Sequence, residues 1–140
     1  IPGTNGGKMS KSANNVINIF LDDKALRKQI MSIETDSTPL EDPKNPDTCN
    51  AFAIYKLLAS ESEIEIMKAN YLGGNYGYGH AKQALFELIV EKFKTERAQY
   101  NYYMNNLAEV DELLRKGAQR ASAVANGVLE KVRAKLGFEN

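Results

Sequence analysis

Apolar residues recur at every third or fourth position between Val110 and Leu136, near the end of this 140-residue chain. That spacing places them on one face of an α-helix and excludes a strand, whose faces alternate every two residues. The pattern predicts one long helix that ends at Gly137, because glycine commonly terminates helices. The stripe predicts a face that packs on neighbouring helices. Four small residues in it would allow a close approach: Gly117, Ala118, Ala121 and Ala125.

Several shorter elements precede this helix. Residues 15–21 (NVINIFL) contain Val, Ile and Phe and predict a short strand or an extended piece. Asp22 or Asp23 can cap a helix whose apolar residues follow at helical spacing. Residues 35–48 hold three of the four prolines and predict a loop, after which 49–60 again show helical spacing.

Two capping-box patterns predict further helix starts, at 60–63 (S-x-x-E) and at 106–109 (N-x-x-E). Between them, residues 73–80 (GGNYGYGH) hold four glycines and predict a break. A long helix is expected from Ala81 through Tyr102. The whole pattern predicts an all-α fold, a bundle of about five helices behind an N-terminal loop.

Composition excludes several classes of protein. The 18 basic and 18 acidic residues give a formal charge of zero, so the total charge does not indicate a nucleic-acid-binding protein. The single Cys49 excludes a disulfide framework and favours a reducing compartment. The single His80 has no clustered partner, so no metal site is expected. No apolar run is long enough for a membrane span.

The neutral total conceals an uneven distribution of charge. Residues 21–48 carry seven acidic and four basic side chains. Residues 115–136 carry Glu130 as the one acidic side chain and six basic side chains, which could bind phosphates or could form an ordinary charged helix face. These six are Arg115, Lys116, Arg120, Lys131, Arg133 and Lys135.

The N-terminal loop contains the string GGKMSKSANN, at residues 6–15. Two mobile ammonium groups beside two serine hydroxyls can surround a polyphosphate and follow its negative charge during phosphoryl or nucleotidyl transfer. Residue types alone leave two interpretations open, a phosphate-binding loop and a solvated linker.

Residues 8–12 spell KMSKS, which is the signature of class I aminoacyl-tRNA synthetases. The sequence that follows resembles the bacterial tryptophanyl-tRNA synthetases in five stretches and over nearly the whole chain, from Gly6 to Phe138. The residues after the signature are Ala-Asn-Asn, which departs from the Gly-Asn found in several other class I enzymes. The five stretches are NNVINIF, LRKQIMSIETDS, CNAFAIYKL, GGNYGYGHAKQAL and VDELLRKGAQRASAVANGVLEKVRAKLGF.

The resemblance implies a role for each residue of the signature. Lys8 and Lys11 would be catalytic and would stabilise charge on the departing pyrophosphate, with Lys11 the more important. Ser10 and Ser12 would contact ATP through hydroxyl or backbone groups. Met9 would anchor the loop to the body, and all five residues would form the ATP-binding site.

The same resemblance implies the organisation of a longer enzyme. Residues 1–20 would be the KMSKS loop and the end of the catalytic domain, and 21–140 would be the helical anticodon-binding domain. The family's second signature, an HIGH-like motif, needs two histidines, so the nucleotide-binding Rossmann domain is expected to be absent from this chain. The chain opens at Ile1 without an initiator methionine, and we expect a fragment that cannot activate tryptophan alone.

The implied enzyme is a cytoplasmic homodimer that uses ATP and Mg²⁺, charges tRNA(Trp) with tryptophan, and dimerises mainly through the absent domain. No ligand is expected on this fragment and no membrane association. The candidate tRNA-binding side chains are aromatic or amide groups that could recognise unstacked bases, and cations that could meet phosphates. They are Tyr76, Tyr78, Lys82, Gln83, Arg115, Lys116 and Arg120.

Two alternatives remain at this point. The chain could be the corresponding piece of a tyrosyl-tRNA synthetase, although the sequence of the KMSKS loop and the residues around it disfavours this alternative. It could also be a non-enzymatic helical interaction module whose loop matches by accident, in which case Tyr76 and Tyr78 would only pack over a hinge between helices.

Overall fold

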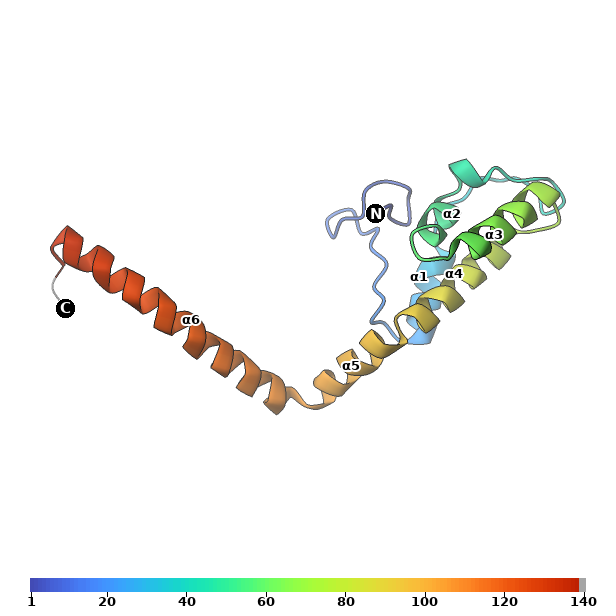
Figure 1. The fold of residues 1–140 in the computed structure, drawn as a ribbon. Helices are drawn as coiled ribbons and strands as arrows, with labels where there is room; N and C mark the ends of the chain where they lie inside the picture. The colour runs from blue at the N-terminus through green and yellow to red at the C-terminus, as the bar shows by residue number, and fades with distance from the viewer. Residues whose placement is uncertain (139–140) are drawn as a thin grey trace. The chain divides into compact units, whose positions relative to one another are not determined.

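A computed structural model describes residues 1–138 of the chain. These residues form six α-helices, one short 3₁₀ helix and no strand, so the predicted all-α class is confirmed (Figure 1). The elements are α1 (Asp23–Met31), η1 (Pro46–Thr48), α2 (Asn50–Tyr55), α3 (Glu61–Gly73), α4 (Tyr78–Lys92), α5 (Lys94–Asn105) and α6 (Leu107–Leu136).

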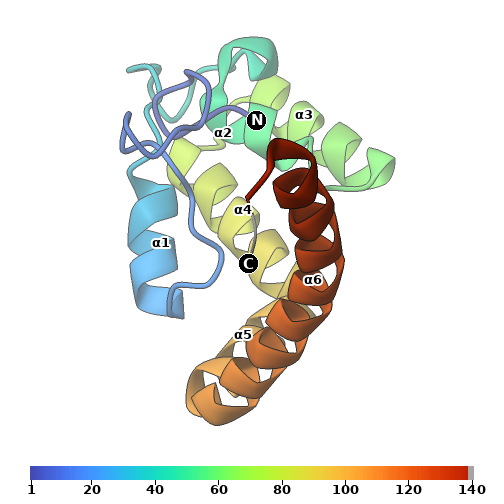
Figure 2. The same cartoon turned by 90° about the vertical axis from the view of Figure 1, so that its left-hand side faces the viewer.

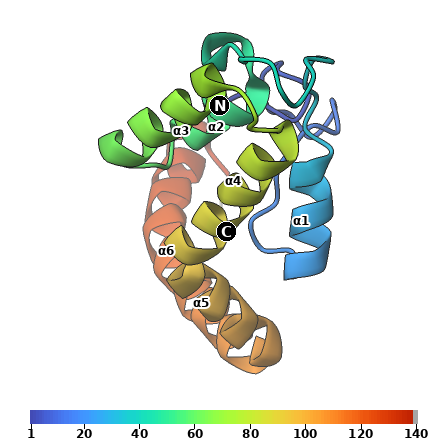
Figure 3. The same ribbon diagram turned by 90° about the vertical axis from the view of Figure 1, so that its right-hand side faces the viewer.

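The chain divides into two compact units, Ile1–Arg97 and the residues from Ala98 onward. In the first unit α4 contacts both α1 and α2, and η1 contacts α2 and α3. Figures 2 and 3 show α1 and α4 side by side, with the loop segment (blue) leading into α1.

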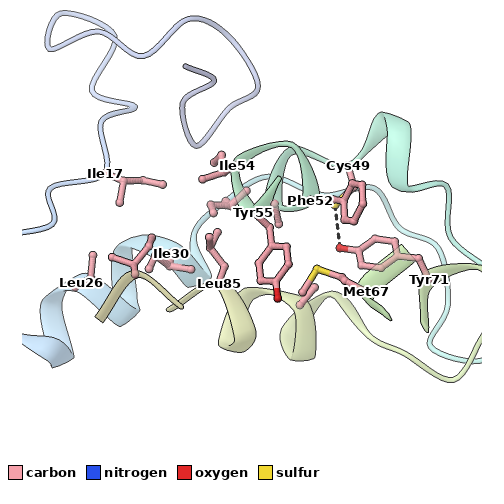
Figure 4. Packing of buried hydrophobic residues seen from close by; sticks show 14 residues of the cluster. Ile17, Leu26, Ile30, Cys49, Phe52, Ile54, Tyr55, Met67, Tyr71 and Leu85 are labelled. Carbon is pink, nitrogen blue, oxygen red and sulfur yellow. Dashed lines mark hydrogen bonds between the residues drawn. The ribbon is translucent and has the colours of Figure 1, made fainter. Parts of the chain in front are cut away.

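The hydrophobic core of the described residues lies entirely within the first unit. Tyr71 and Phe52 are its largest fully buried side chains, and their ring centroids are 5.6 Å apart. The Tyr71 hydroxyl and the Cys49 sulfur share a buried hydrogen bond of 3.2 Å (Figure 4). The other fully buried large side chains are Leu26, Ile30, Ile33, Leu85 and Ile89.

Local signals predicted two helix starts correctly in this unit. The Asp22 side chain accepts a hydrogen bond from the Ala25 N–H at 2.9 Å, which caps α1 as predicted. At the start of α3, the capping box of Ser60 and Glu63 has both of its halves.

Two predicted elements in this unit were partly wrong. Residues 15–18 form no regular secondary structure, and the predicted strand is absent there, because the Val16 carbonyl and the Asn18 N–H bond to the Gln29 side chain instead of to a neighbouring strand. The helix expected over 49–60 is α2, which ends at Tyr55 and continues as turns.

The long helix expected from Ala81 begins earlier and is divided. Gly77 has an extended conformation, and α4 begins directly after it at Tyr78. Phe93 then leaves the helical region, with φ −104° and ψ 19°, while its side chain packs against the core. The chain re-enters a helix at Lys94, which is why the described residues contain six α-helices.

Helix α6 has the predicted extent but lacks the predicted capping box. The Asn106 side chain donates to the Tyr102 carbonyl at 2.7 Å instead of capping α6. The Glu109 carboxylate accepts from the Tyr102 hydroxyl at 2.7 Å. At the other end, Gly137 takes a left-handed conformation with φ 76° and ends the helix as expected.

The apolar stripe of α6 is not covered by the other residues of its own unit. Leu114, Val124 and Leu136 are 66%, 73% and 67% exposed, and no residue of α6 is buried. The second unit otherwise contains the end of α5, which also buries none of its residues. Nothing described within this unit could therefore cover the stripe.

Candidate functional site

The N-terminal loop is held by backbone hydrogen bonds from both of its ends. The Met9 N–H donates to the Ile1 carbonyl at 3.0 Å, and the Thr4 N–H donates to the Asn15 carbonyl at 3.0 Å. The Glu34 N–H, beyond α1, donates to the Thr4 carbonyl at 2.8 Å. The loop is thus attached to the helical part of the first unit and has a defined conformation.

Both lysines of the loop are exposed, and neither ammonium group has a hydrogen-bond or ion-pair partner among residues 1–138. Between them, the Ser10 and Ser12 hydroxyls share a hydrogen bond of 2.8 Å. The Asn14 N–H donates to the Lys11 carbonyl at 3.2 Å, which closes a turn. The loop therefore presents two unpaired cations next to two hydroxyls, a donor set that fits phosphate oxygens.

Met9 is half-buried and packs against the hydrophobic core, as expected for a residue that anchors the loop. It lies on an apolar groove of about 400 Å³. The groove is lined by Ile1, Met9, Ile17, Ile19, Ile54, Leu57, Leu58, Ile89 and Phe93.

Asn15 is a functional candidate that the sequence reasoning missed. Its side chain is buried, and its amide oxygen accepts a hydrogen bond from the Ser10 N–H at 2.8 Å. Its amide nitrogen donates to the Asn5 side-chain oxygen at 2.7 Å and to the Lys8 carbonyl at 3.1 Å. The sequence offers no signal for this role, because Asn14 and Asn15 are indistinguishable by local pattern.

The segment between the loop and α1 is fixed to the helices by two long side chains. Gln29 of α1 accepts from the Asn18 N–H at 2.8 Å and donates to the Val16 carbonyl at 2.5 Å. Arg97 donates to the Ile19 carbonyl at 2.6 Å. These bonds satisfy backbone groups that a strand partner would otherwise satisfy.

The two aromatic candidates for base recognition lie next to each other on the core. The rings of Tyr76 and Tyr78 contact the buried Tyr71, with centroids 5.8 Å and 6.1 Å away. Tyr76 also contacts the ring of His80 at 5.5 Å. Both tyrosines are half-buried, so each has one side in the core and leaves part of its ring accessible.

The Tyr78 hydroxyl donates to the Asp36 carboxylate at 2.7 Å and so joins α4 to the loop after α1. Hydrogen bonds from Thr38 and from Tyr78 lower the pKa of Asp36 below its usual value. Burial, with the hydrogen bond to Asp36, raises the pKa of Tyr78 to about 12. Tyr78 is therefore a neutral donor at physiological pH.

Lys44 is one of two buried polar residues in the described part of the chain, and its side chain stabilises the same loop. Its ammonium group lies 5.6 Å from the centroid of the Tyr78 ring and makes a cation–π contact with it. It donates to three backbone carbonyl groups at 2.7, 3.2 and 2.9 Å, those of Pro39, Leu40 and Asp42.

The polar candidates of α4 are also engaged in contacts. The Lys82 ammonium donates to the Met31 carbonyl at the end of α1 at 3.1 Å, and burial lowers the pKa of Lys82. Gln83 accepts from the Arg27 side chain at 2.9 Å and donates to Glu87 at 2.8 Å. Both residues therefore connect α4 to neighbouring groups in the first unit.

The three cationic candidates of α6 belong to the second unit and differ in availability. Arg115 donates twice to the Glu112 carboxylate, at 2.9 and 2.8 Å, and the Lys116 ammonium lies 3.4 Å from the same carboxylate. Arg120 is exposed and has no ion-pair partner within the described residues. Arg120 is thus the cation of the three that is most available to a phosphate.

His80 acts at the beginning of α4, where its Nδ1 accepts a hydrogen bond from the Gly77 N–H at 3.3 Å. Among residues 1–138, no three His, Cys, Asp or Glu side chains are grouped so that they could hold a metal ion. None of the helices that the structure describes is long and apolar enough to cross a membrane.

Residues 1–94 match the family model of the class I tRNA synthetases for tryptophan and tyrosine. The chain belongs to this family. The matched segment contains the KMSKS loop and α1–α4, and it ends at the first residue of α5.

Comparison with curated relatives distinguishes the tryptophan enzymes from the tyrosine enzymes within this family. The tryptophan–tRNA ligases of Rhodopirellula baltica and Fusobacterium nucleatum are each 44% identical over 138 residues, which is 99% of this chain. That alignment covers 43% and 42% of the two relatives, so the chain spans less than half of their length. The resemblance to tryptophanyl-tRNA synthetases is confirmed, and the tyrosyl alternative is not favoured.

A solved structure supports the same family. The tryptophanyl-tRNA synthetase of Campylobacter jejuni, crystallised with ADP and tryptophan, matches with a TM-score of 0.93 at 44% identity. The match covers 98% of this chain and 43% of that enzyme. The helical chain therefore has the architecture of part of a tryptophanyl-tRNA synthetase, as the fold prediction required.

Proposed function

We propose that this chain works as the C-terminal part of a tryptophan–tRNA ligase, where it supplies the phosphate-binding loop and the helical domain that recognises tRNA(Trp). The observation that carries this proposal is the KMSKS string in an exposed loop with two unpaired ammonium groups. The 44% identity to tryptophan–tRNA ligases supports the assignment.

In the proposed reaction the carboxylate of tryptophan attacks the α-phosphate of ATP, which forms tryptophanyl-adenylate and releases pyrophosphate. The bond from the α-phosphorus to the bridging oxygen breaks, and negative charge accumulates on the pyrophosphate. Lys8 and Lys11 stabilise this charge, because a preorganised cation binds the transition state more strongly than the ground state. Ser10 and Ser12 provide hydroxyl and backbone contacts, and Met9 anchors the loop.

Mg²⁺ in this proposal is held by the ATP phosphates rather than by the loop. Ammonium groups cannot coordinate a metal ion, whereas Mg²⁺ readily binds phosphate oxygens together with water. The loop residues therefore fit the phosphates, and the ion neutralises phosphate charge from elsewhere.

For tRNA recognition we assign two surfaces. The accessible parts of Tyr76 and Tyr78 would stack on unpaired anticodon bases, with Lys82 and Gln83 beside them. Arg120, and to a lesser extent Arg115 and Lys116, would meet phosphates from α6. The enzyme would be a cytoplasmic homodimer whose subunits meet mainly outside this chain.

The deciding experiment is the variant Lys11→Ala in the full-length parent enzyme, assayed by tryptophan-dependent ATP–pyrophosphate exchange. We expect kcat to fall by about a hundredfold or more while tryptophan binding is retained, because the lost charge acts on the transition state. Lys24→Ala is the matched control, since Lys24 is an exposed lysine of α1 without a partner in the described chain. An unchanged rate for Lys11→Ala would reject the proposed function.

A further inference from the structure

The KMSKS loop contains a buried polar side chain that phosphate binding does not explain. Asn15 is 2% exposed and lies on the first unit's N-terminal loop. A buried side-chain amide is costly unless its polar atoms are paired, so its hydrogen bonds indicate what it does.

The Asn15 side-chain amide forms hydrogen bonds with the backbone of the residue before Met9 and of the residue after it. Its oxygen accepts from the Ser10 N–H at 2.8 Å, and its nitrogen donates to the Lys8 carbonyl at 3.1 Å. One planar amide thus bonds a backbone donor and a backbone acceptor two residues apart. Asparagine suits this position because it offers an acceptor and a donor at the end of one short side chain, which Asp and Leu do not.

Two neighbours keep the amide in place. The Asn5 side-chain oxygen accepts the second Asn15 N–H at 2.7 Å and also accepts from the Gly7 N–H at 3.1 Å. The backbone packs closely around the amide at Gly3, where an added Cβ would lie 2.4 Å from the Asn15 side chain. The amide is therefore fixed from two sides, and it in turn fixes the Lys8–Ser10 backbone.

Met9 lies in the middle of this fixed segment. Its N–H bonds to Ile1 and its side chain packs on the core. With the Lys8 carbonyl and the Ser10 N–H held by Asn15, the backbone has little freedom between the two ends. The Lys11 side chain itself is exposed and is not contacted by Asn15, so Asn15 acts on the loop's conformation rather than on any ligand.

We propose that Asn15 is a positioning residue, which holds the Lys8–Ser10 backbone in the conformation that presents both lysines to the triphosphate. This inference rests on the proposed function and adds a residue outside the KMSKS string to the catalytic apparatus. It explains how two catalytic lysines can be preorganised although a flexible, glycine-rich segment precedes them in the chain.

The first test measures the loop in this chain itself. Asn15→Ala should increase the rate of trypsin cleavage after Lys8 and Lys11, and the hydrogen-exchange rate of the Ser10 amide, by about tenfold. Asn70→Ala, at an exposed position on α3, is the matched control and should change neither rate. Unchanged cleavage and exchange in Asn15→Ala would overturn the proposal.

The second test measures catalysis in the full-length parent enzyme. Asn15→Ala should lower kcat of ATP–pyrophosphate exchange by about tenfold without changing tryptophan binding. Asn5→Ala, which removes one partner of the amide at an exposed position, should act in the same direction and more weakly. This milder variant keeps the test decisive if Asn15→Ala does not fold.

Combination with Lys11→Ala separates positioning from general destabilisation. If Asn15 acts through the lysines, adding Asn15→Ala to Lys11→Ala should lower the rate much less than in the parent. A double variant whose loss equals the product of the single losses would overturn the proposal. If Lys11→Ala alone has no effect, the proposed function itself fails, and if Lys11→Ala is impaired but Asn15→Ala is not, the positioning role alone fails.

Discussion

Asp36 and Tyr78 form a bond between two segments that are far apart in sequence. The Tyr78 hydroxyl donates to the carboxylate at 2.7 Å, and the Thr38 N–H donates to the same oxygen at 2.9 Å. Both bonds favour the charged carboxylate, which lowers the pKa of Asp36 in the folded state. The ionised Asp36 carboxylate should therefore contribute to the stability of the folded state.

The pH dependence of stability tests this dependence through Asp36→Asn. Because the folded pKa is below the ordinary value of 3.8, the stabilisation is present above that value and is lost as the pH falls through the folded pKa. We expect the wild type to lose more unfolding free energy than Asp36→Asn between about pH 6 and about pH 3, measured by urea unfolding.

Asp42→Asn is the control for this experiment, since the Asp42 side chain lies in the same loop and has no hydrogen-bond partner in the described residues. It should show the wild-type pH dependence. The same dependence in Asp36→Asn would contradict the assignment.

Some properties of single residues in the loop could be predicted from the sequence, and others could not. The exposure of the two lysines was expected from a polar, glycine-rich loop. The amide role of Asn15 could not be predicted, because it depends on Asn5, Lys8 and Ser10 being brought together by a fold that no local pattern encodes.

At the scale of elements, the end of α3 depends on a close approach. Gly74 has φ 71°, and an added Cβ would lie 2.4 Å from the Glu41 carbonyl oxygen. Gly74→Ala should destabilise the protein by more than about 1 kcal/mol, because it adds strain at a left-handed position and a collision with backbone.

Gly73→Ala is a control one residue earlier. Gly73 is the last residue of α3, and a Cβ added there would have no neighbouring atom within 4 Å, so this variant should be neutral or slightly stabilising in urea unfolding. Equal destabilisation by both variants would show that the contact with Glu41 does not matter.

Helix α6 provides a test of tRNA binding within the proposed function. Arg120 has no ion-pair partner in the described chain, whereas Arg115 is bound by Glu112. In the full-length enzyme, Arg120→Ala should weaken tRNA binding and reduce the slope of log affinity against log salt by about one. Arg115→Ala should have a smaller effect. If the salt dependence of tRNA binding is unchanged in both variants, α6 does not contact tRNA phosphates through these residues.

Two similar four-residue patterns had different outcomes. At 60–63 the capping box forms, and the side chains of Ser60 and Glu63 each accept from the other residue's backbone N–H. At 106–109 the Tyr102 carbonyl and hydroxyl engage both side chains. A local pattern predicts a helix start reliably, but the side chains that cap it depend on what the preceding helix offers.

At the scale of the whole molecule, burial is distributed unequally. The buried core belongs to residues 1–97, and α6 buries no residue. Hydrogen exchange should therefore show higher protection for the amides of α4 than for those of α6. Helical periodicity correctly predicted the all-α class, but it does not identify what covers the apolar stripe of α6, because periodicity shows only that a helix face is apolar.

The variant Leu85→Ala tests how independent the two units are. Leu85 is fully buried in α4, so its truncation should cost about 2–5 kcal/mol and lower the protection of α4 amides. Protection of α6 amides should not change, since α6 does not share that core. A parallel loss in α6 would show that the units unfold together.

The arrangement around Lys44 has a practical consequence for chemical labelling. Acylating reagents must reach the amine, and the Lys44 amine is buried and donates to three backbone carbonyl groups beneath an aromatic ring. The exposed lysines of the KMSKS loop should be acylated quickly and Lys44 slowly. Acylation of Lys44 is then a mass-spectrometric marker for the opening of the loop that carries it.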